Sequence, residues 1–82
     1  MSADRYVRII MRDETEKIVR ETPVAYEAAR IEREYEFEDG AVVRYEWRDI
    51  SLGGFNHRFS LVQSPKPNPD KLSPGVIHTI DY

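Results

Sequence analysis

Cysteine is absent from the 82 residues of the chain. The chain therefore has no disulfide, no thiolate metal site and no cysteine nucleophile. Long apolar runs are missing as well, and the apolar stretch near the N-terminus is limited to Ile9, Ile10 and Met11. Three residues are too few for a signal sequence or a membrane span. We therefore expect a soluble, cytoplasmic protein that does not engage a membrane.

An excess of basic residues is also missing. Lysine and arginine number 12 against 15 acidic residues, which gives a formal net charge of −3 and an isoelectric point of about 5.3. Non-specific binding to nucleic acid needs a basic surface, so this balance argues against a nucleic-acid partner. No serine lies in a G-x-S-x-G context, and Gly53-Gly54 lacks the lysine and the further glycines of a phosphate-binding loop. The sequence indicates no cofactor, and we expect a protein without enzymatic activity.

The length of the chain permits one domain, over residues 1–82, with a small core. At this size the free energy gained by burying apolar surface roughly balances the loss of chain entropy. Small cores are often completed by a second subunit or by another protein. We therefore expect either a protein partner or self-association as a homodimer.

Residues 29–47 carry the clearest pattern in the sequence, an alternation of residue types on both sides of Asp39-Gly40. Such period-two alternation around a turn signal is typical of a β-hairpin with one apolar face and one charged face. A two-residue loop at Asp39-Gly40 would mix the faces, whereas the three-residue loop Glu38-Asp39-Gly40 keeps them separate, with Gly40 in the left-handed conformation. The resulting cross-strand pairs are Tyr35 with Val43, Arg33 with Tyr45, Ile31 with Trp47, and Glu34 with Arg44.

Residues 23–34 allow two interpretations. In the first, a threonine-capped helix with an apolar stripe occupies this segment and packs on the sheet. In the second, the first strand of the hairpin starts earlier, with a bulge near Ala28-Ala29. A helix would leave Trp47 without a cross-strand partner, and we therefore favour the strand.

The rest of the chain indicates further short strands. Alternating apolar residues predict strands at 5–12, 15–21, 57–63 and 76–82. Glycines indicate a loop at 51–56, and prolines predict an extended loop at 64–75. The expected fold is mainly β, a small antiparallel sheet or barrel-like meander of five or six strands. The alternative is an α+β fold with the helix at 23–34.

Glutamates occupy every second position of the first hairpin strand. Side chains two residues apart project from the same face of a strand, so these carboxylates form a line of negative charge. The line is a candidate contact surface for a basic protein partner. The simpler interpretation is a solvated outer face that protects the sheet from aggregation. The candidate residues are Glu32, Glu34, Glu36, Glu38 and Asp39.

Aromatic residues suggest one alternative function. Tyr35, Tyr45 and Trp47, with arginines nearby, are arranged like the stacking surface of an OB-like domain that binds single-stranded nucleic acid. Aromatic residues that alternate along a strand are more commonly core residues. The acidic net charge also disfavours this alternative.

Histidines suggest a second alternative, a small enzyme or metal protein. His57 and His78 are the two histidines of the chain, and Asp49 or Asp81 could assist them in metal binding or acid–base chemistry. Their spacing matches no H-x-E or H-E-x-x-H motif. We therefore assign no metal ligand and no catalytic residue.

Overall fold

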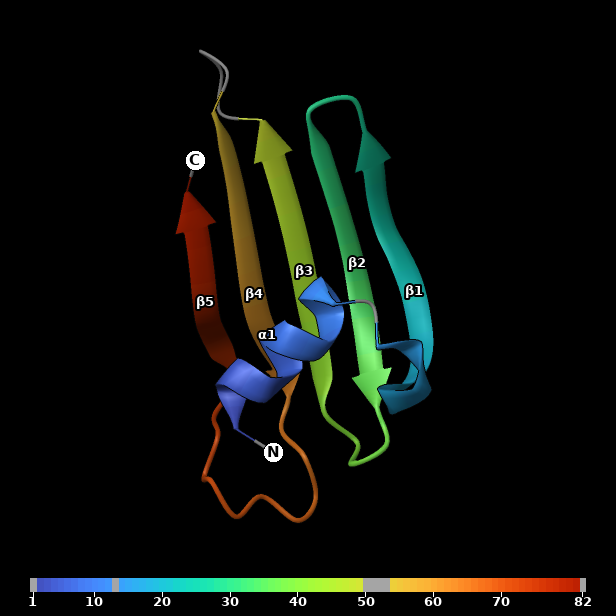
Figure 1. The fold of residues 1–82 in the computed structure, drawn as a ribbon, viewed down its shortest axis with the longest axis vertical. Coiled ribbons are helices and arrows are strands. Elements are labelled where there is room, and N and C mark those ends of the chain that lie inside the picture. Colours follow the sequence, from blue (N-terminus) through green and yellow to red (C-terminus); the bar gives the residue numbers. More distant parts are fainter. Residues whose placement is uncertain (1, 13, 50–53, 82) are drawn as a thin grey trace.

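The computed structural model describes residues 2–12, 14–49 and 54–81 (Figure 1). These residues form five strands, one short α-helix and one turn of 3-10 helix, which confirms the mainly β fold. In chain order the elements are α1 (Ala3–Met11), η1 (Thr15–Lys17), β1 (Ile18–Glu27), β2 (Arg30–Phe37), β3 (Val42–Asp49), β4 (Phe55–Gln63) and β5 (Gly75–Asp81).

The strands form one antiparallel sheet in sequence order, β1-β2-β3-β4-β5. The sheet is open rather than barrel-like, with β1 and β5 as its edges. α1 lies diagonally across one face, over the half of the sheet that ends in the β2–β3 turn (Figure 1). We call this the lower half, and we call the half that ends in the β1–β2 turn the upper half.

The β2–β3 hairpin has the predicted three-residue loop. The Phe37 amide donates a hydrogen bond to the Ala41 carbonyl at 2.9 Å, and the Gly40 amide donates to the Phe37 carbonyl at 3.0 Å. Gly40 has a φ of +84°, in the left-handed region that residues with a side chain disfavour. The predicted pairs are all present, namely Tyr35–Val43, Arg33–Tyr45, Ile31–Trp47 and Glu34–Arg44.

The N-terminal segment was predicted wrongly, because residues 5–12 lie largely in a helix and not in a strand. Val7 and Ile9 fit the alternation of a strand, but Tyr6, Ile9 and Ile10 equally fit the i, i+3, i+4 spacing of a helix. Tyr6 and Val7 are both buried, which a strand covered on one face would not allow, since adjacent side chains point to opposite faces. The helix instead buries both beneath its contact with the sheet.

Residues 23–27 and 30–34 are extended, so the alternative helix at this position is wrong, but the single strand predicted here is divided into the end of β1 and the start of β2. The strand predicted at 15–21 starts only at Ile18, because the preceding residues form η1. Pro23 lies in β1, and this position agrees with the fold because proline is tolerated in edge strands. The edge position therefore accommodates a residue that would interrupt a central strand.

A turn at Ala28-Ala29 joins β1 to β2. The bulge predicted at this point is wrong, and the register shifts of β1 lie instead at Val19 and Val24. The Asp49 amide donates a hydrogen bond to the Ala29 carbonyl at 2.9 Å, which ties the turn to β3. Neither glycine nor asparagine marks this turn, so the sequence carried no signal for it.

β4 confirms the strand predicted at 57–63, and β5 confirms the strand predicted at 76–82 as far as Asp81, the last described residue. The loop predicted at 51–56 is wrong at Phe55 and Asn56, which belong to β4, and its residues 51–53 lie outside the described residues. The proline-rich loop between β4 and β5 has no regular secondary structure, as predicted. Within it, the Asn68 side chain donates to the Leu72 carbonyl at 2.7 Å and accepts from the Leu72 amide at 2.9 Å, which holds Leu72 against the core.

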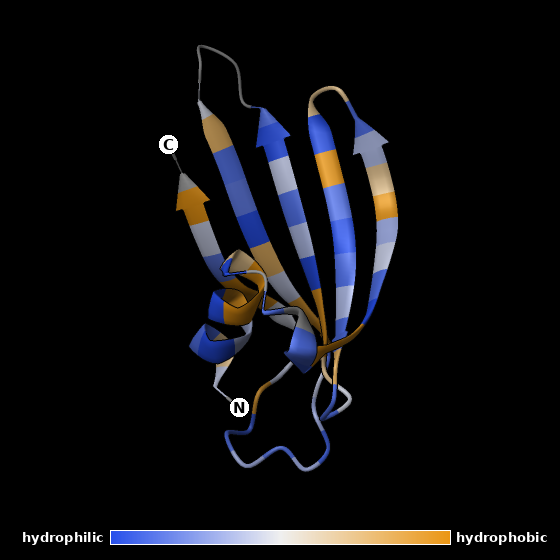
Figure 2. Cartoon of the chain, turned by 45° about the vertical axis from the view of Figure 1, so that its right-hand side comes forward, coloured by the Kyte–Doolittle hydropathy of each residue, from blue (hydrophilic) through white to orange (hydrophobic). Residues whose placement is uncertain are grey.

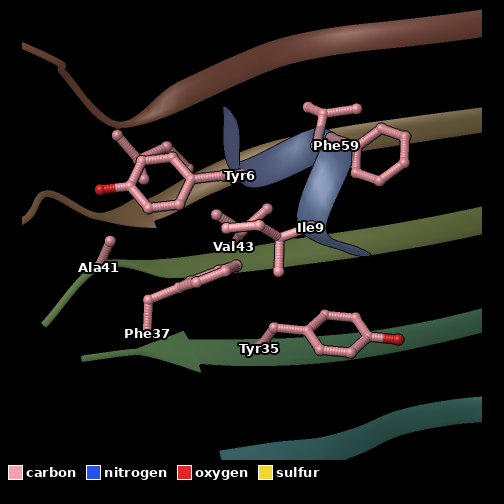
Figure 3. Packing of buried hydrophobic residues seen from close by; sticks show 9 residues of the cluster. Tyr6, Ile9, Tyr35, Phe37, Ala41, Val43 and Phe59 are labelled. Carbon is pink, nitrogen blue, oxygen red and sulfur yellow. The ribbon is translucent and has the colours of Figure 1, made fainter. Parts of the chain in front are cut away.

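The core lies between α1 and the sheet (Figure 3). Tyr6 and Ile9 point from α1 toward the strands, where they meet Phe37, Val43 and Phe59 (Figure 3). The rings of Tyr6 and Phe37 meet edge to face, with centroids 4.8 Å apart. The buried hydrophobic residues are thus gathered around α1, and the packing of this end stabilises the fold.

Candidate functional site

α1 is too short to cover the sheet. Its nine residues extend about 14 Å, whereas strands of eight to ten residues extend about 26–33 Å. The same face is therefore without a helix in the upper half (Figure 1, Figure 2). Hydrophobic positions nevertheless continue into the upper parts of β2, β4 and β5 (Figure 2).

Besides Arg33, Asp49 and Ile80, six side chains of the upper half project to the same side as the core. Alternate residues of a strand share a face, so the positions that continue from Tyr35, Val43 and Phe59 lie on the core side. Tyr26 of β1 is paired with Ile31 of β2 and joins this face. We call the set the aromatic platform, which consists of Tyr26, Ile31, Tyr45, Trp47, Phe55 and His57.

Ring contacts order the centre of the aromatic platform. The Tyr45 hydroxyl and His57 Nδ1 lie 2.6 Å apart, and the two rings stack with centroids 5.7 Å apart. Trp47 packs against Phe55 with centroids 5.6 Å apart. The outer members face solvent, since Tyr26 is 79% and Phe55 is 40% exposed. A partner would therefore meet a surface that is already ordered, which reduces the entropy lost on binding.

Arg33 shares the face of the aromatic platform, and its charge is paired. Arg33 lies 3.4 Å from the Glu21 carboxylate across the β1–β2 ladder. A hydrogen bond with Tyr35 raises the pKa of Arg33. Because both members of the ion pair are largely exposed, the pair adds little stability. It does offset the arginine charge on this face.

The predicted acidic row lies on the opposite face, where arginines neutralise part of it. Glu34 faces Arg44 as predicted, with Arg44 Nε 3.0 Å from the carboxylate, and this hydrogen bond raises the pKa of Arg44. Glu32 is buried, and its carboxylate lies 3.5 Å from Arg30 and 3.9 Å from Arg48. These two glutamates therefore belong to an ion-pair network across the sheet.

The lower members of the acidic row differ from one another. Glu36 is half-buried on β2, and Glu38 is exposed in the β2–β3 turn. Asp39 accepts hydrogen bonds from the Tyr6 hydroxyl at 2.5 Å and from the Ala41 amide at 3.0 Å. Asp39 thus connects α1 to the turn, and its carboxylate has a structural role.

The Tyr6–Asp39 contact is expected to make the stability of the fold decrease at alkaline pH. Burial, together with the hydrogen bond to Asp39 and its negative charge, raises the pKa of Tyr6 above the usual value of about 10. Above pH 10 or so the unfolded chain releases a proton that the folded chain retains, so the free energy of unfolding falls as the pH rises.

We expect Tyr6→Phe to flatten this decline by up to about 1.4 kcal/mol per pH unit in urea unfolding between about pH 9 and about pH 12. The control is Tyr26→Phe, at a site 79% exposed, which is expected to keep the wild-type slope. A slope that is the same in wild type and Tyr6→Phe would contradict the assignment.

The three residues of the nucleic-acid alternative share one face of the sheet but differ in exposure. Tyr35 is buried in the core and is therefore not available to a base. Tyr45 and Trp47 are half-buried members of the aromatic platform. The nearby Arg33 is paired with Glu21, so it offers limited charge to a phosphate backbone.

The two histidines lie on neighbouring strands of one face. His57 is paired with Ile80 and His78 with Phe59, so the histidines are offset along the β4–β5 ladder. His57 Nδ1 is engaged by Tyr45, and the His78 ring lies 6.0 Å from that of Phe59. No group of three possible metal ligands occurs in the part of the chain that the structure describes.

Two exposed features were missed in the sequence. Tyr26 was missed because the β1–β2 turn carries no signal, although a hairpin centred on that turn would have paired it with Ile31. Arg5 and Arg8 of α1 and Arg12, which follows its last residue, are spaced three and four residues apart, and all three are exposed. In the strand predicted for residues 5–12, Arg8 and Arg12 would share one face and Arg5 would lie on the other.

No protein-family model, no curated protein and no solved structure matches the chain. None of the helices among residues 2–12, 14–49 and 54–81 is long and apolar enough to cross a membrane. The argument for a function therefore depends on the surfaces described above, and the aromatic platform is the most distinctive of them.

Proposed function

We propose that this chain is a small non-enzymatic protein-interaction module whose contact surface is the aromatic platform. One observation carries the proposal: α1 covers one half of a sheet face and leaves the ring-lined other half open to solvent (Figure 1). Large exposed apolar patches are characteristic of interaction sites. Aromatic residues are also enriched where protein surfaces bind one another.

The aromatic platform supports this proposal better than the acidic row does. Among the predicted contact residues, Glu32 and Glu34 are held by arginines, and Asp39 is held by α1 and the turn. A basic partner on that face would have to compete with these contacts, which leaves Glu36 and Glu38 as its candidate anchors. A partner on the aromatic platform would mainly displace water from apolar surface.

Photo-crosslinking in cells that express the tagged chain tests the contact surface. Benzoylphenylalanine in place of Phe55 puts the crosslinker on the aromatic platform, and in place of Val62 it puts the crosslinker on the opposite face of the same strand. The sites are matched, with 40% and 44% exposure. We expect protein adducts from position 55 and few from position 62. Equal yields at the two positions would contradict the proposal.

A third crosslinking site separates the aromatic platform from the acidic row. Benzoylphenylalanine in place of Glu36 lies among the carboxylates that remain available on the opposite face. We expect few adducts from this position. Adducts with basic proteins at position 36, together with none at position 55, would place the contact surface on the acidic row instead.

A further inference from the structure

We infer that the aromatic platform binds the aromatic platform of a second copy of this chain, so that two sheets pack face to face. This inference rests on the proposed function and names the partner of the same surface. It follows from three features of the structure. These are the height by which α1 rises above the uncovered upper half of the sheet, the chemistry of the exposed surface, and the protection of the β1 edge.

α1 rises above the uncovered upper half of the sheet by about the thickness that a second packed sheet would occupy. A helix with its side chains is about 10–12 Å in diameter, and packed sheets lie about 10 Å apart. A second copy running in the opposite sense can therefore lie on the upper half without displacing α1. A two-fold axis across the strands then places the second α1 beyond the upper end of the first sheet. The layer between the two sheets then consists of the first α1, the two aromatic platforms packed against each other, and the second α1.

The chemistry of the aromatic platform is compatible with its own copy. A two-fold interface brings like residues together near its axis, so charge of one sign at its centre would be repulsive. The centre of the platform consists of the rings of Tyr45, Trp47 and His57, and it contains no carboxylate, lysine or arginine. Arg33 lies on the same face, opposite Tyr45, and is paired with Glu21. Two such surfaces can therefore approach with the Arg33 charge already offset.

The β1 edge is less suited to self-association than this face. Pro23 lies in the strand, and the register shifts at Val19 and Val24 interrupt its regular ladder. Proline and bulges are devices by which edge strands avoid pairing with another chain. The sheet face therefore offers a second copy a less obstructed surface than the β1 edge does.

The size of the surface indicates a weak dimer. Five strands spaced about 4.8 Å apart and about four residues deep cover a plan area of about 300 Å². Standard interfaces bury about 800 Å² of accessible surface on each partner. The accessible surface of the platform exceeds its plan area because side chains project from the sheet, but the interface still lies at the small end of this range. We expect a dissociation constant of about 10–100 µM.

Sedimentation equilibrium of the full chain tests the inference. Between about 1 µM and about 1 mM, we expect the weight-average mass to rise from 9.6 kDa toward twice that value. Trp47 is the one tryptophan of the chain and lies in the aromatic platform, so its emission reports the same event. We expect the emission to shift to shorter wavelength as the concentration rises, because the ring leaves water.

Matched substitutions locate the interface. Phe55→Glu places a carboxylate on each platform at a 40% exposed site, and we expect it to raise the dissociation constant at least about tenfold. Tyr26→Glu, at a site 79% exposed, is a second variant in which the fold is at less risk. The control is Val62→Glu on the opposite face, at 44% exposure, which is expected to leave the dissociation constant unchanged. Equal weakening by Val62→Glu would overturn the inference.

A constant mass of 9.6 kDa up to about 1 mM would also overturn the inference. If crosslinking at position 55 then still captures another protein, the proposed function stands and the partner differs. If position 55 captures nothing, both proposals fail. Salt-sensitive quenching of Trp47 emission by an oligothymidylate, in a chain that stays monomeric, would assign the surface to single-stranded nucleic acid.

Discussion

Phe59→Ala is expected to lower the free energy of unfolding by about 3–5 kcal/mol. Phe59 is fully buried in the middle of β4, and its ring lies 5.0 Å from that of Tyr45 and 6.0 Å from that of His78. Domains are stable by only about 5–15 kcal/mol, so this loss would unfold a large fraction of so small a protein. Urea unfolding followed by circular dichroism measures the change.

The control for this substitution is Phe55→Ala. Phe55 is the same residue type, on the same strand and the same face, but it is 40% exposed. We expect a loss below about 1.5 kcal/mol at a protein concentration where the chain is monomeric, because little packing is removed. Similar losses for the two substitutions would show that the core extends into the upper half, contrary to the structure.

Ile9→Ala is expected to lower the free energy of unfolding by about 2–5 kcal/mol, because it leaves a cavity between α1 and the sheet. Ile9 is fully buried, and it points from α1 toward the strands near Val43 (Figure 3). α1 supplies Tyr6, Val7 and Ile9 to the buried cluster, so loosening it exposes the lower half of the sheet. Denaturant unfolding at fixed protein concentration measures this loss.

Met11→Ala separates the helix from the strand predicted for the same segment. In a strand, Ile9 and Met11 would share a face, and the two substitutions would have similar effects. In α1, Ile9 is buried and Met11 is 51% exposed. We therefore expect Met11→Ala to change the free energy of unfolding by less than about 1 kcal/mol. A loss as large as that of Ile9→Ala would contradict the helix.

The β2–β3 hairpin was predictable because its determinants are local. Alternation set the two faces, Gly40 set the left-handed position, and the requirement to keep the faces separate selected the loop. The same reasoning placed Glu34 opposite Arg44, where the ion pair is found. Interactions between residues close in sequence are enough to specify the register and turn of such a hairpin, although its stability also needs the packing of α1 and the neighbouring strands.

The acidic row was predictable as a set of side chains but not as a surface. Its position on one face followed from alternation, whereas its charge depends mainly on Arg44 and Arg48 of the neighbouring strand. Burial of Glu32 between Arg30 and Arg48 requires that β2 and β3 lie side by side. A line of carboxylates in the sequence is thus a partly neutralised network in the folded chain.

Two features could not be inferred from local sequence pattern. These are the helix in residues 5–12 and the exposure of the aromatic platform. Alternation along β2, β3 and β4 was enough to establish an antiparallel sheet with an apolar face. A segment as short as residues 5–12 fits both periodicities, and packing against distant strands selected the helix. The length and position of α1 then divided the apolar face into a buried half and an open half. That division depends on contacts between residues far apart in the sequence, and it is what turns a core-like pattern of rings into a candidate binding surface.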